Sequence, residues 1–271
     1  MPMPDVSARP LAGLTSLRER RIVVTGGGRG LGKAIAARLA EAGARVLIGD
    51  IDAELATAAA AELADGYGTD VLGVEMDVTD SDDMRTAADA AVRRWSGLDA
   101  WVNNAGVFPN VPIADMDDMT WDHVFAVNTR GTLAGTREAA RVMCDGGHGG
   151  VIVNICSTAG FRGSAPGLAA YVGSKHAVRG ITRQSALELA PHGIRVLGVA
   201  PSYVPTEGNQ LAAATPPAPE FREASTPLMM TSPVGRTGTP DDIARVVFFC
   251  VSDLSMFMTG STLLADGGTT A

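Results

Sequence analysis

The chain has 271 residues, of which 46% are hydrophobic and 19% charged, and its formal net charge is -8. A chain of this length can bury a full hydrophobic core. Because the chain is acidic and has no long blocks of like charge, it lacks the basic face that nucleic acids and anionic membranes require. The three cysteines show no paired spacing, and no apolar run reaches membrane-spanning length. These features predict a cytoplasmic protein with reduced thiols, no metal site and a small molecule as its partner.

Strand and helix patterns alternate after residues 1–17, which are expected to form a flexible tail. Residues 21–25 show a buried strand pattern, 30–43 an amphipathic helix and 44–50 a second strand, which together make a βαβ unit. Strands, some continuing into loops, follow at 71–76, 98–106, 149–157, 193–200 and about 261–268, with helices at 80–95 and 239–253. Residues 18–271 are therefore predicted to form one α/β domain around a parallel sheet of about seven strands.

The segment Pro205–Gly235 interrupts this alternation. It is rich in Pro, Thr and Ala, and Met229 and Met230 lie near its end. Because it is longer than an ordinary connection, we expect a substrate lid at about 205–235, with a solvent-exposed linker as the alternative.

A glycine-rich turn, TGGGRGLG, occupies Thr25–Gly32 between the first strand and the first helix. Glycines at this place let the backbone turn sharply and let a pyrophosphate approach the free N–H groups of the helix N-terminus. Asp50 ends the second strand, where a carboxylate that binds ribose hydroxyls is expected. The sequence therefore predicts a dinucleotide site, in which a substitution of Asp50, at a strand end, should change stability little. The lack of a G-K-[ST] sequence disfavours a nucleotide triphosphatase.

Tyr171 and Lys175 are four residues apart in the run GLAAYVGSKHAV. On a helix they would lie on the same face, one above the other. An ammonium close to a phenol favours the phenolate, so the pair could exchange protons near neutral pH. The alternative is a half-buried tyrosine with a hydrogen-bonded hydroxyl and a lysine that extends to solvent.

Several separated motifs occur in a fixed order along the chain: the TGxxxGxG turn, DVT at Asp77–Thr79, NNAG at Asn103–Gly106, Asn128, Ser157, and Tyr171 with Lys175. In this set and order the chain resembles the short-chain dehydrogenase/reductase family. The resemblance extends from about Arg21 to Gly268 and implies a doubly wound Rossmann-type fold, with helices on both faces of the sheet and a nicotinamide cofactor.

The resemblance also implies a role for each catalytic residue. Ser157 and Tyr171 would hold the substrate oxygen, with Tyr171 as the acid/base. Lys175 would lower the pKa of Tyr171 and bind the nicotinamide ribose, and Asn128 would support a water in a proton relay. Asn103 is expected to be mainly structural. The implied cofactor-binding residues are Gly26, Arg29, Gly30, Leu31, Gly32, Asp50, Asp77, Val78, Asn104, Ala105, Gly106, Tyr171, Lys175, Val204 and Thr206.

The leading hypothesis from these residues is an NAD-dependent dehydrogenase of secondary alcohols that also reduces ketones. Hydrophobic or cyclic substrates are expected in a pocket lined by Val107, Phe108, Phe161 and the lid. The family usually has glycine where this chain has Ser202, which adds a side chain beside the expected nicotinamide pocket. Arg29, which could meet a 2′-phosphate, favours an NADPH-dependent ketoacyl-type reductase as the alternative. A nucleotide-sensing regulator without turnover is a further hypothesis.

The resemblance further implies a homotetramer. Its subunit contacts would involve the last strand and the helix that carries the catalytic tyrosine.

Overall fold

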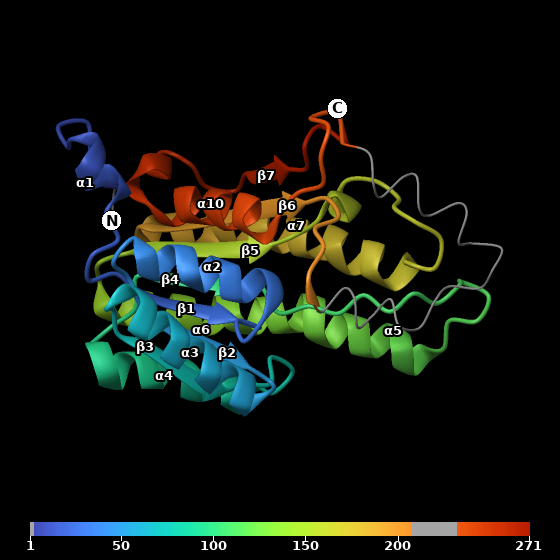
Figure 1. The fold of residues 1–271 in the computed structure, drawn as a ribbon, viewed down its shortest axis with the longest axis horizontal. Helices are drawn as coiled ribbons and strands as arrows, with labels where there is room; N and C mark the ends of the chain where they lie inside the picture. The colour runs from blue at the N-terminus through green and yellow to red at the C-terminus, as the bar shows by residue number, and fades with distance from the viewer. Residues whose placement is uncertain (1–2, 208–231) are drawn as a thin grey trace.

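Seven parallel strands form a central sheet in the order β3-β2-β1-β4-β5-β6-β7 (Figure 1). The computed structural model describes residues 3–207 and 232–271. The strand sequences are rich in Val, Ile and Leu, the residue types of strands that are covered on both faces. The predicted parallel α/β sheet is therefore confirmed. The strands are β1 (Arg21–Thr25), β2 (Arg45–Asp50), β3 (Val71–Glu75), β4 (Ala100–Asn103), β5 (Gly150–Ile155), β6 (Ile194–Pro201) and β7 (Thr262–Ala265).

Helices cover both faces of the sheet (Figure 1). Helices α2, α3 and α10 pack on one face, and α4, α6 and α7 pack on the other. The helices are α1 (Leu11–Thr15), α2 (Gly30–Glu41), α3 (Ala53–Tyr67), α4 (Ser81–Trp95), α5 (Asp118–Phe125), α6 (Gly131–Gly146), α7 (Ala169–Leu189) and α10 (Pro240–Val251). Shorter turns are η1 (Ala126–Arg130), η2 (Thr158–Gly160), η3 (Ala190–His192) and η4 (Asp253–Ser255).

The side chains of β1 alternate between the two helical layers. Ile22 and Val24 pack with α2 and α10, whereas Val23 packs with α4 and α6 on the opposite face. This alternation follows from the two-residue repeat of a strand. One sheet therefore supplies the core for both layers, as expected for a doubly wound domain.

The N-terminal segment is attached to the domain. Leu17 is 1% exposed, and its N–H donates to the carbonyl oxygen of Ala42 at 3.0 Å. Arg9 and Arg20 both form ion pairs with Asp253, at 2.5 and 2.8 Å. These contacts differ from the expectation of a flexible tail through residue 17, since the packed part of the chain already includes Leu17.

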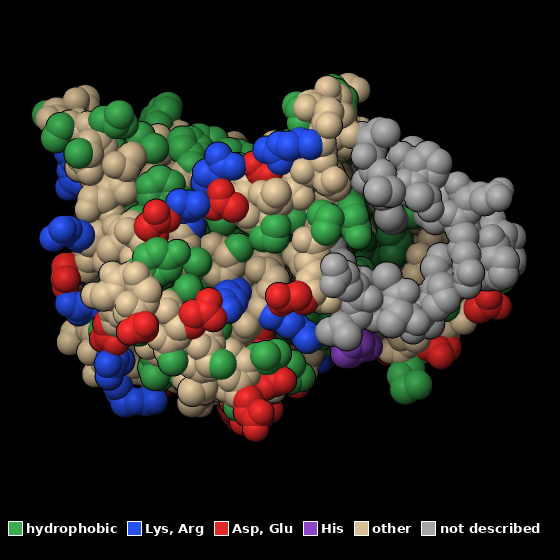
Figure 2. All heavy atoms as spheres, in the orientation of Figure 1, with side chains coloured by type: hydrophobic (Ala, Val, Ile, Leu, Met, Phe, Trp, Pro, Cys, Tyr) green, Lys and Arg blue, Asp and Glu red, His purple; other side chains and the backbone are tan. Residues whose placement is uncertain are grey.

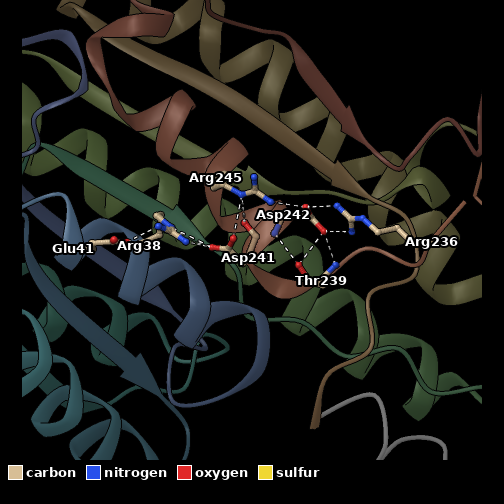
Figure 3. A network of polar contacts seen from close by, with 7 residues as sticks. All are labelled: Arg38, Glu41, Arg236, Thr239, Asp241, Asp242 and Arg245. Atoms are coloured by element: carbon tan, nitrogen blue, oxygen red, sulfur yellow. Dashed lines mark hydrogen bonds and ion pairs between the residues drawn. The ribbon is translucent and has the colours of Figure 1, made fainter. Parts of the chain in front are cut away.

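A polar network at the start of α10 fixes the chain that leads into this helix (Figure 3). Arg236 forms an ion pair with Asp242 at 2.5 Å, and Thr239 and Asp242 form a reciprocal capping box. Asp241 pairs with Arg38 and so links α10 to α2. Satisfying the free N–H groups of the helix start in this way stabilises α10 at its N-terminus.

The chain is anchored on either side of residues 208–231. On the upstream side, a Cβ added to Gly30 would lie 3.2 Å from the Cβ of Thr206, so Thr206 rests against the start of α2. On the downstream side, the hydroxyl of Ser232 donates to the carbonyl oxygen of Gly267 at 2.7 Å. Both anchors belong to the packed domain.

Acidic and basic side chains are interspersed on the face shown in Figure 2. Among the described residues on that face, the basic side chains do not form a continuous field of the kind that a phosphate backbone binds. Among the helices that the structure describes, none combines the length and apolar character needed to cross a bilayer.

Candidate active site

The glycine-rich turn between β1 and α2 leaves no room for a side chain at Gly26 or Gly32. Gly26 has a φ of 62°, and a Cβ on it would lie 2.8 Å from the Cα of Ala105. A Cβ on Gly32 would overlap the carbonyl oxygen of Gly26 and lie 2.5 Å from Nδ2 of Asn104. The turn therefore requires glycine at both positions.

The N-terminus of α2 opens from this turn. Gly30 has a φ of 55° and begins the helix, and Leu31 packs against the core. Within the described chain, the exposed Arg29 at the N-cap makes no side-chain capping hydrogen bond. Uncapped N–H groups and the helix dipole favour an anion at this point. The residues present therefore fit the pyrophosphate of a dinucleotide.

Asp50, at the end of β2, contacts the same turn. Its Oδ2 accepts a hydrogen bond from the N–H of Gly28 at 2.9 Å, and its Oδ1 accepts from the N–H of Asp52 at 3.2 Å. The residue is only 9% exposed. Asp50 therefore supports the glycine-rich turn in addition to its predicted contact with a ribose.

Asp77 and Val78 follow β3, the strand next to β2. Oδ1 of Asp77 accepts hydrogen bonds from both the N–H and the hydroxyl of Thr79, each at 2.8 Å. Val78 is buried, and a Cβ on Gly131 would lie 3.0 Å from its Cγ2. The two residues thus lie on the edge that carries Asp50, while their contact with a cofactor stays a prediction.

Thr25 joins the turn after β4 to the glycine-rich turn. Its hydroxyl oxygen accepts hydrogen bonds from the N–H groups of Asn104 and Ala105, at 3.0 and 3.1 Å. The side-chain amide of Asn104 donates back to the carbonyl oxygens of Thr25 and Gly26, both at 2.9 Å. Thr25 was not among the predicted site residues, although its place at the head of the TGxxxGxG motif could have indicated it.

Asn103 lies behind this turn and is buried. It accepts a hydrogen bond from the indole of Trp101 at 2.8 Å and donates to Asn154 and Thr136, at 2.9 and 3.3 Å. These bonds link β4, β5 and α6. The side chain therefore has the structural role expected for it.

Ser157 and Tyr171 meet where α7 passes the end of β5. The Ser157 hydroxyl lies close enough to the Tyr171 hydroxyl to act on it, and its effect is to lower the pKa of Tyr171. The ring of Phe108 packs edge-on against the Tyr171 ring, with centroids 5.9 Å apart. Two hydroxyls thus lie together beside an aromatic side chain, an arrangement suited to holding one polar oxygen of an otherwise apolar substrate.

Lys175 lies one turn further along α7. Its Nζ is 5.7 Å from the centroid of the Tyr171 ring and donates to the carbonyl oxygen of Ile155 at 2.8 Å. Burial lowers the pKa of Lys175, and burial raises the pKa of Tyr171 to about 12. The lysine was expected to lower the pKa of Tyr171. In the protein alone, the effect of burial is larger, and the pKa of Tyr171 is raised instead.

Asn128 lies in η1, a π-helical turn between α5 and α6. Its side chain exchanges two hydrogen bonds of 2.8 Å with the backbone of Val107 and donates to the hydroxyl of Ser174 at 3.0 Å. A Cβ on Gly106 would lie 3.3 Å from Oδ1 of Asn128. Asn128 thus holds the turn after Gly106 against α7, and its support of a relay water stays a prediction.

The remaining predicted residues lie around this cluster. Val204 is buried, and the hydroxyl of Ser202 donates to the carbonyl oxygen of Asp266 at 3.4 Å, toward the C-terminal turn. The guanidinium of Arg179 stacks over Phe161 at 4.0 Å from the ring centroid. Most of the predicted lid, including Met229 and Met230, lies outside the described residues.

The chain belongs to the short-chain dehydrogenase/reductase family. Residues 26–270 match the family described as enoyl-(acyl carrier protein) reductase. A solved short-chain type dehydrogenase/reductase from Mycobacterium marinum superposes with a TM-score of 0.89 at 32% identity, over 97% of this chain and 100% of the other.

Curated relatives carry dehydrogenase and reductase names. The chain is 38% identical to 2-(S)-hydroxypropyl-CoM dehydrogenase 3 of Xanthobacter autotrophicus, over 94% of this chain and 98% of the relative. It is 36% identical to cyclopentanol dehydrogenase of a Comamonas species, over 94% of this chain and 98% of the relative. A 3-oxoacyl-[acyl-carrier-protein] reductase of Aquifex aeolicus is 35% identical to the chain, over 91% of this chain and 95% of the relative. These similarities identify the chain as an oxidoreductase of this family.

Proposed function

We propose that the chain is an NAD-dependent dehydrogenase of secondary alcohols that also reduces the corresponding ketones. The observation that carries the proposal is the meeting of Ser157, Tyr171 and Lys175 at the end of β5, close to Gly106 and the glycine-rich turn. The 36% identity to a cyclopentanol dehydrogenase, together with the Phe108 ring beside Tyr171, favours hydrophobic cyclic alcohols as substrates.

The proton of the alcohol is handled by side chains of this protein. Ser157 and Tyr171 hold the substrate oxygen through their hydroxyls, and the Tyr171 phenolate accepts the proton during oxidation. The Lys175 ammonium stabilises that phenolate, since an opposite charge close by favours the charged form. When bound, NAD supplies the acceptor for the hydride of the carbinol carbon.

The cofactor would be held mainly by the backbone. The N-terminus of α2 would bind the pyrophosphate, and Asp50 would accept hydrogen bonds from the adenosine ribose hydroxyls. The turn formed by Asn104, Ala105 and Gly106 would lie beneath the nicotinamide side. Asp50 favours NAD because the 2′-phosphate of NADP would place a second negative charge against it.

An NADPH-dependent ketoacyl-type reductase is the second candidate. The exposed Arg29 at the start of α2 and the 35% identical 3-oxoacyl-[acyl-carrier-protein] reductase support it. Arg29 offers a charge for a 2′-phosphate, whereas Asp50 opposes one. The residue after Asp50 is Ile51, where an NADP site would benefit from a cation.

Turnover assays separate these candidates. The purified chain is mixed with NAD or NADP and a panel of cyclic and linear secondary alcohols, and the reduced cofactor is followed by absorbance. Oxidation with NAD supports the proposal, and efficient oxidation only with NADP supports the reductase. Cofactor binding measured by calorimetry without any turnover would indicate a nucleotide sensor.

A homotetramer is the expected assembly. β7 is an edge strand whose Leu264 is 46% exposed, and Leu187 on α7 is 74% exposed. Both lie on the elements that the family resemblance assigns to subunit contacts. Light scattering over a dilution series checks this, and a monomer mass throughout would contradict it.

A further inference from the structure

Cys156 lies between the end of β5 and α7, directly before Ser157. Its thiol donates a hydrogen bond to the backbone carbonyl oxygen of Lys175 at 3.2 Å. The preceding residue, Ile155, accepts a hydrogen bond from Lys175 Nζ at 2.8 Å. Two consecutive residues therefore hold both ends of the same lysine, its backbone and its ammonium.

The surroundings of the thiol allow it little movement. Cys156 is 2% exposed and clusters with Val178 of α7 and Ala200 of β6. A Cβ on Gly160 would lie 2.7 Å from Sγ of Cys156 and 2.8 Å from the carbonyl oxygen of Lys175. Burial raises the pKa of the Cys156 thiol, so at neutral pH the sulfur keeps the proton that it donates.

We propose that Cys156 is a positioning residue for Lys175. Its hydrogen bond fixes the turn of α7 from which Lys175 Nζ reaches Ile155 and the catalytic cluster. The proposal rests on the proposed function, in which Lys175 stabilises the Tyr171 phenolate and binds the nicotinamide ribose. Cys156 touches neither the substrate nor the cofactor in this role, because it acts through the lysine.

The flexibility of lysine explains why such a contact matters. Its long stem has many rotamers, so a buried ammonium occupies one place only if its backbone and its Nζ are both held. A displacement of about 1 Å in a catalytic arrangement can lower the rate on the order of 100-fold. The Cys156 bond holds the backbone, and the Ile155 bond holds the ammonium.

Two substitutions test this role. Cys156→Ala and Cys156→Ser are similar in volume and differ in the hydrogen-bond donor, so they separate positioning from packing. In Cys156→Ala we expect kcat to fall about tenfold and the Kd for NADH to rise about threefold, less than the full effect of a 1 Å displacement. Cys156→Ser restores the donor and should recover both values to within about twofold of wild type.

Cys250 supplies matched control substitutions. It is a fully buried thiol in α10, on the other side of the sheet from α7. Cys250→Ala and Cys250→Ser should lower the Tm because they leave a cavity, yet leave kcat and the NADH affinity unchanged.

Equal kcat and equal NADH affinity for Cys156→Ala and Cys156→Ser would overturn the proposal. A crystal structure of Cys156→Ala in which Lys175 Nζ still donates to Ile155 at the original distance would also overturn it. If the wild-type protein oxidises no alcohol, the proposed function fails. The NADH affinities and the Lys175–Ile155 distance still decide the role of Cys156 in that case.

Discussion

The two halves of the site are built in different ways. The phosphate half, from the glycine-rich turn to Asp50, is shaped by backbone N–H groups and by the lack of Cβ atoms at Gly26 and Gly32. The proton-transfer half depends on side chains that come from η1, the end of β5 and α7. Cofactor binding in the phosphate half should therefore respond to the size of a substituted side chain. Turnover in the proton-transfer half should respond to the loss or exchange of a single polar atom.

The largest effect is expected from Tyr171→Phe, which removes one oxygen from the proton-transfer half. Turnover should fall by at least about 100-fold, since that much is associated with a positioned acid/base. The fold and the NADH affinity should be retained, because the ring of Tyr171 stays in contact with Phe108. Steady-state kinetics measures the turnover, and calorimetry measures the NADH affinity. Turnover of Tyr171→Phe within tenfold of the wild-type value would contradict the assignment of Tyr171 as the acid/base.

A size change in the phosphate half should act on binding and stability together. In Gly32→Ala the new Cβ overlaps the carbonyl oxygen of Gly26, so we expect a loss of about 1–3 kcal/mol in the free energy of unfolding and NADH binding at least about tenfold weaker.

Gly66→Ala in α3 is the control for this substitution, since a Cβ there meets nothing within 4 Å. It should be neutral or stabilise the chain by up to about 1 kcal/mol. Denaturant unfolding of the two variants compares them directly, and similar stabilities would show that the turn tolerates a side chain.

The pH dependence should report the proton-transfer half alone. Burial raises the pKa of Tyr171 to about 12, so the protonated form dominates at neutral pH. Alcohol oxidation uses the phenolate and should rise up to about tenfold per pH unit, whereas ketone reduction uses the phenol and should not rise. Rates measured in both directions from pH 6 to 10 test this, and oxidation that does not increase with pH would contradict it.

The smallest effect concerns the cofactor preference, which depends on Asp50 in the phosphate half. NAD should exceed NADP at least about tenfold in kcat/KM, because the Asp50 carboxylate repels a 2′-phosphate. Asp50→Ser should narrow or invert this ratio. Comparable kcat/KM values with both cofactors in the wild type would show that Arg29 dominates.

The structure changes one part of the Asp50 prediction. A small effect on stability was expected from its place at a strand end, but the carboxylate accepts two backbone hydrogen bonds and is nearly buried. Asp50→Ser should therefore cost about 1–3 kcal/mol in the free energy of unfolding. Asp50→Asn, which keeps acceptor capacity in a side chain of the same shape, should cost less.

Local signals in the sequence predicted the strands and the glycine-rich turn, because apolar runs and glycine spacing act within a few residues. No helix is predicted from the sequence between Asp50 and Val71, although Asp52 caps the start of α3 and Gly68 ends it with a φ of 63°. The place of Thr25 at the head of the TGxxxGxG motif could have indicated it, but its partner Asn104 lies far along the chain. The contact of Cys156 with Lys175 also joins separate segments, and no local pattern reveals it. The π-helical turn around Asn128 is likewise set by packing between α5, α6 and α7.

The anchors at Thr206 and Ser232 have a consequence for how this scaffold can diversify. Both anchors rest on the packed domain, and Arg236 and Asp242 secure the chain further downstream. Doubling the length of a connection between fixed points costs only about 0.6 kcal/mol in closure entropy. A longer connection between the two anchors would therefore cost the packed domain little stability, so the chain can accept insertions between Thr206 and Ser232 while β1 to β7 keep their arrangement.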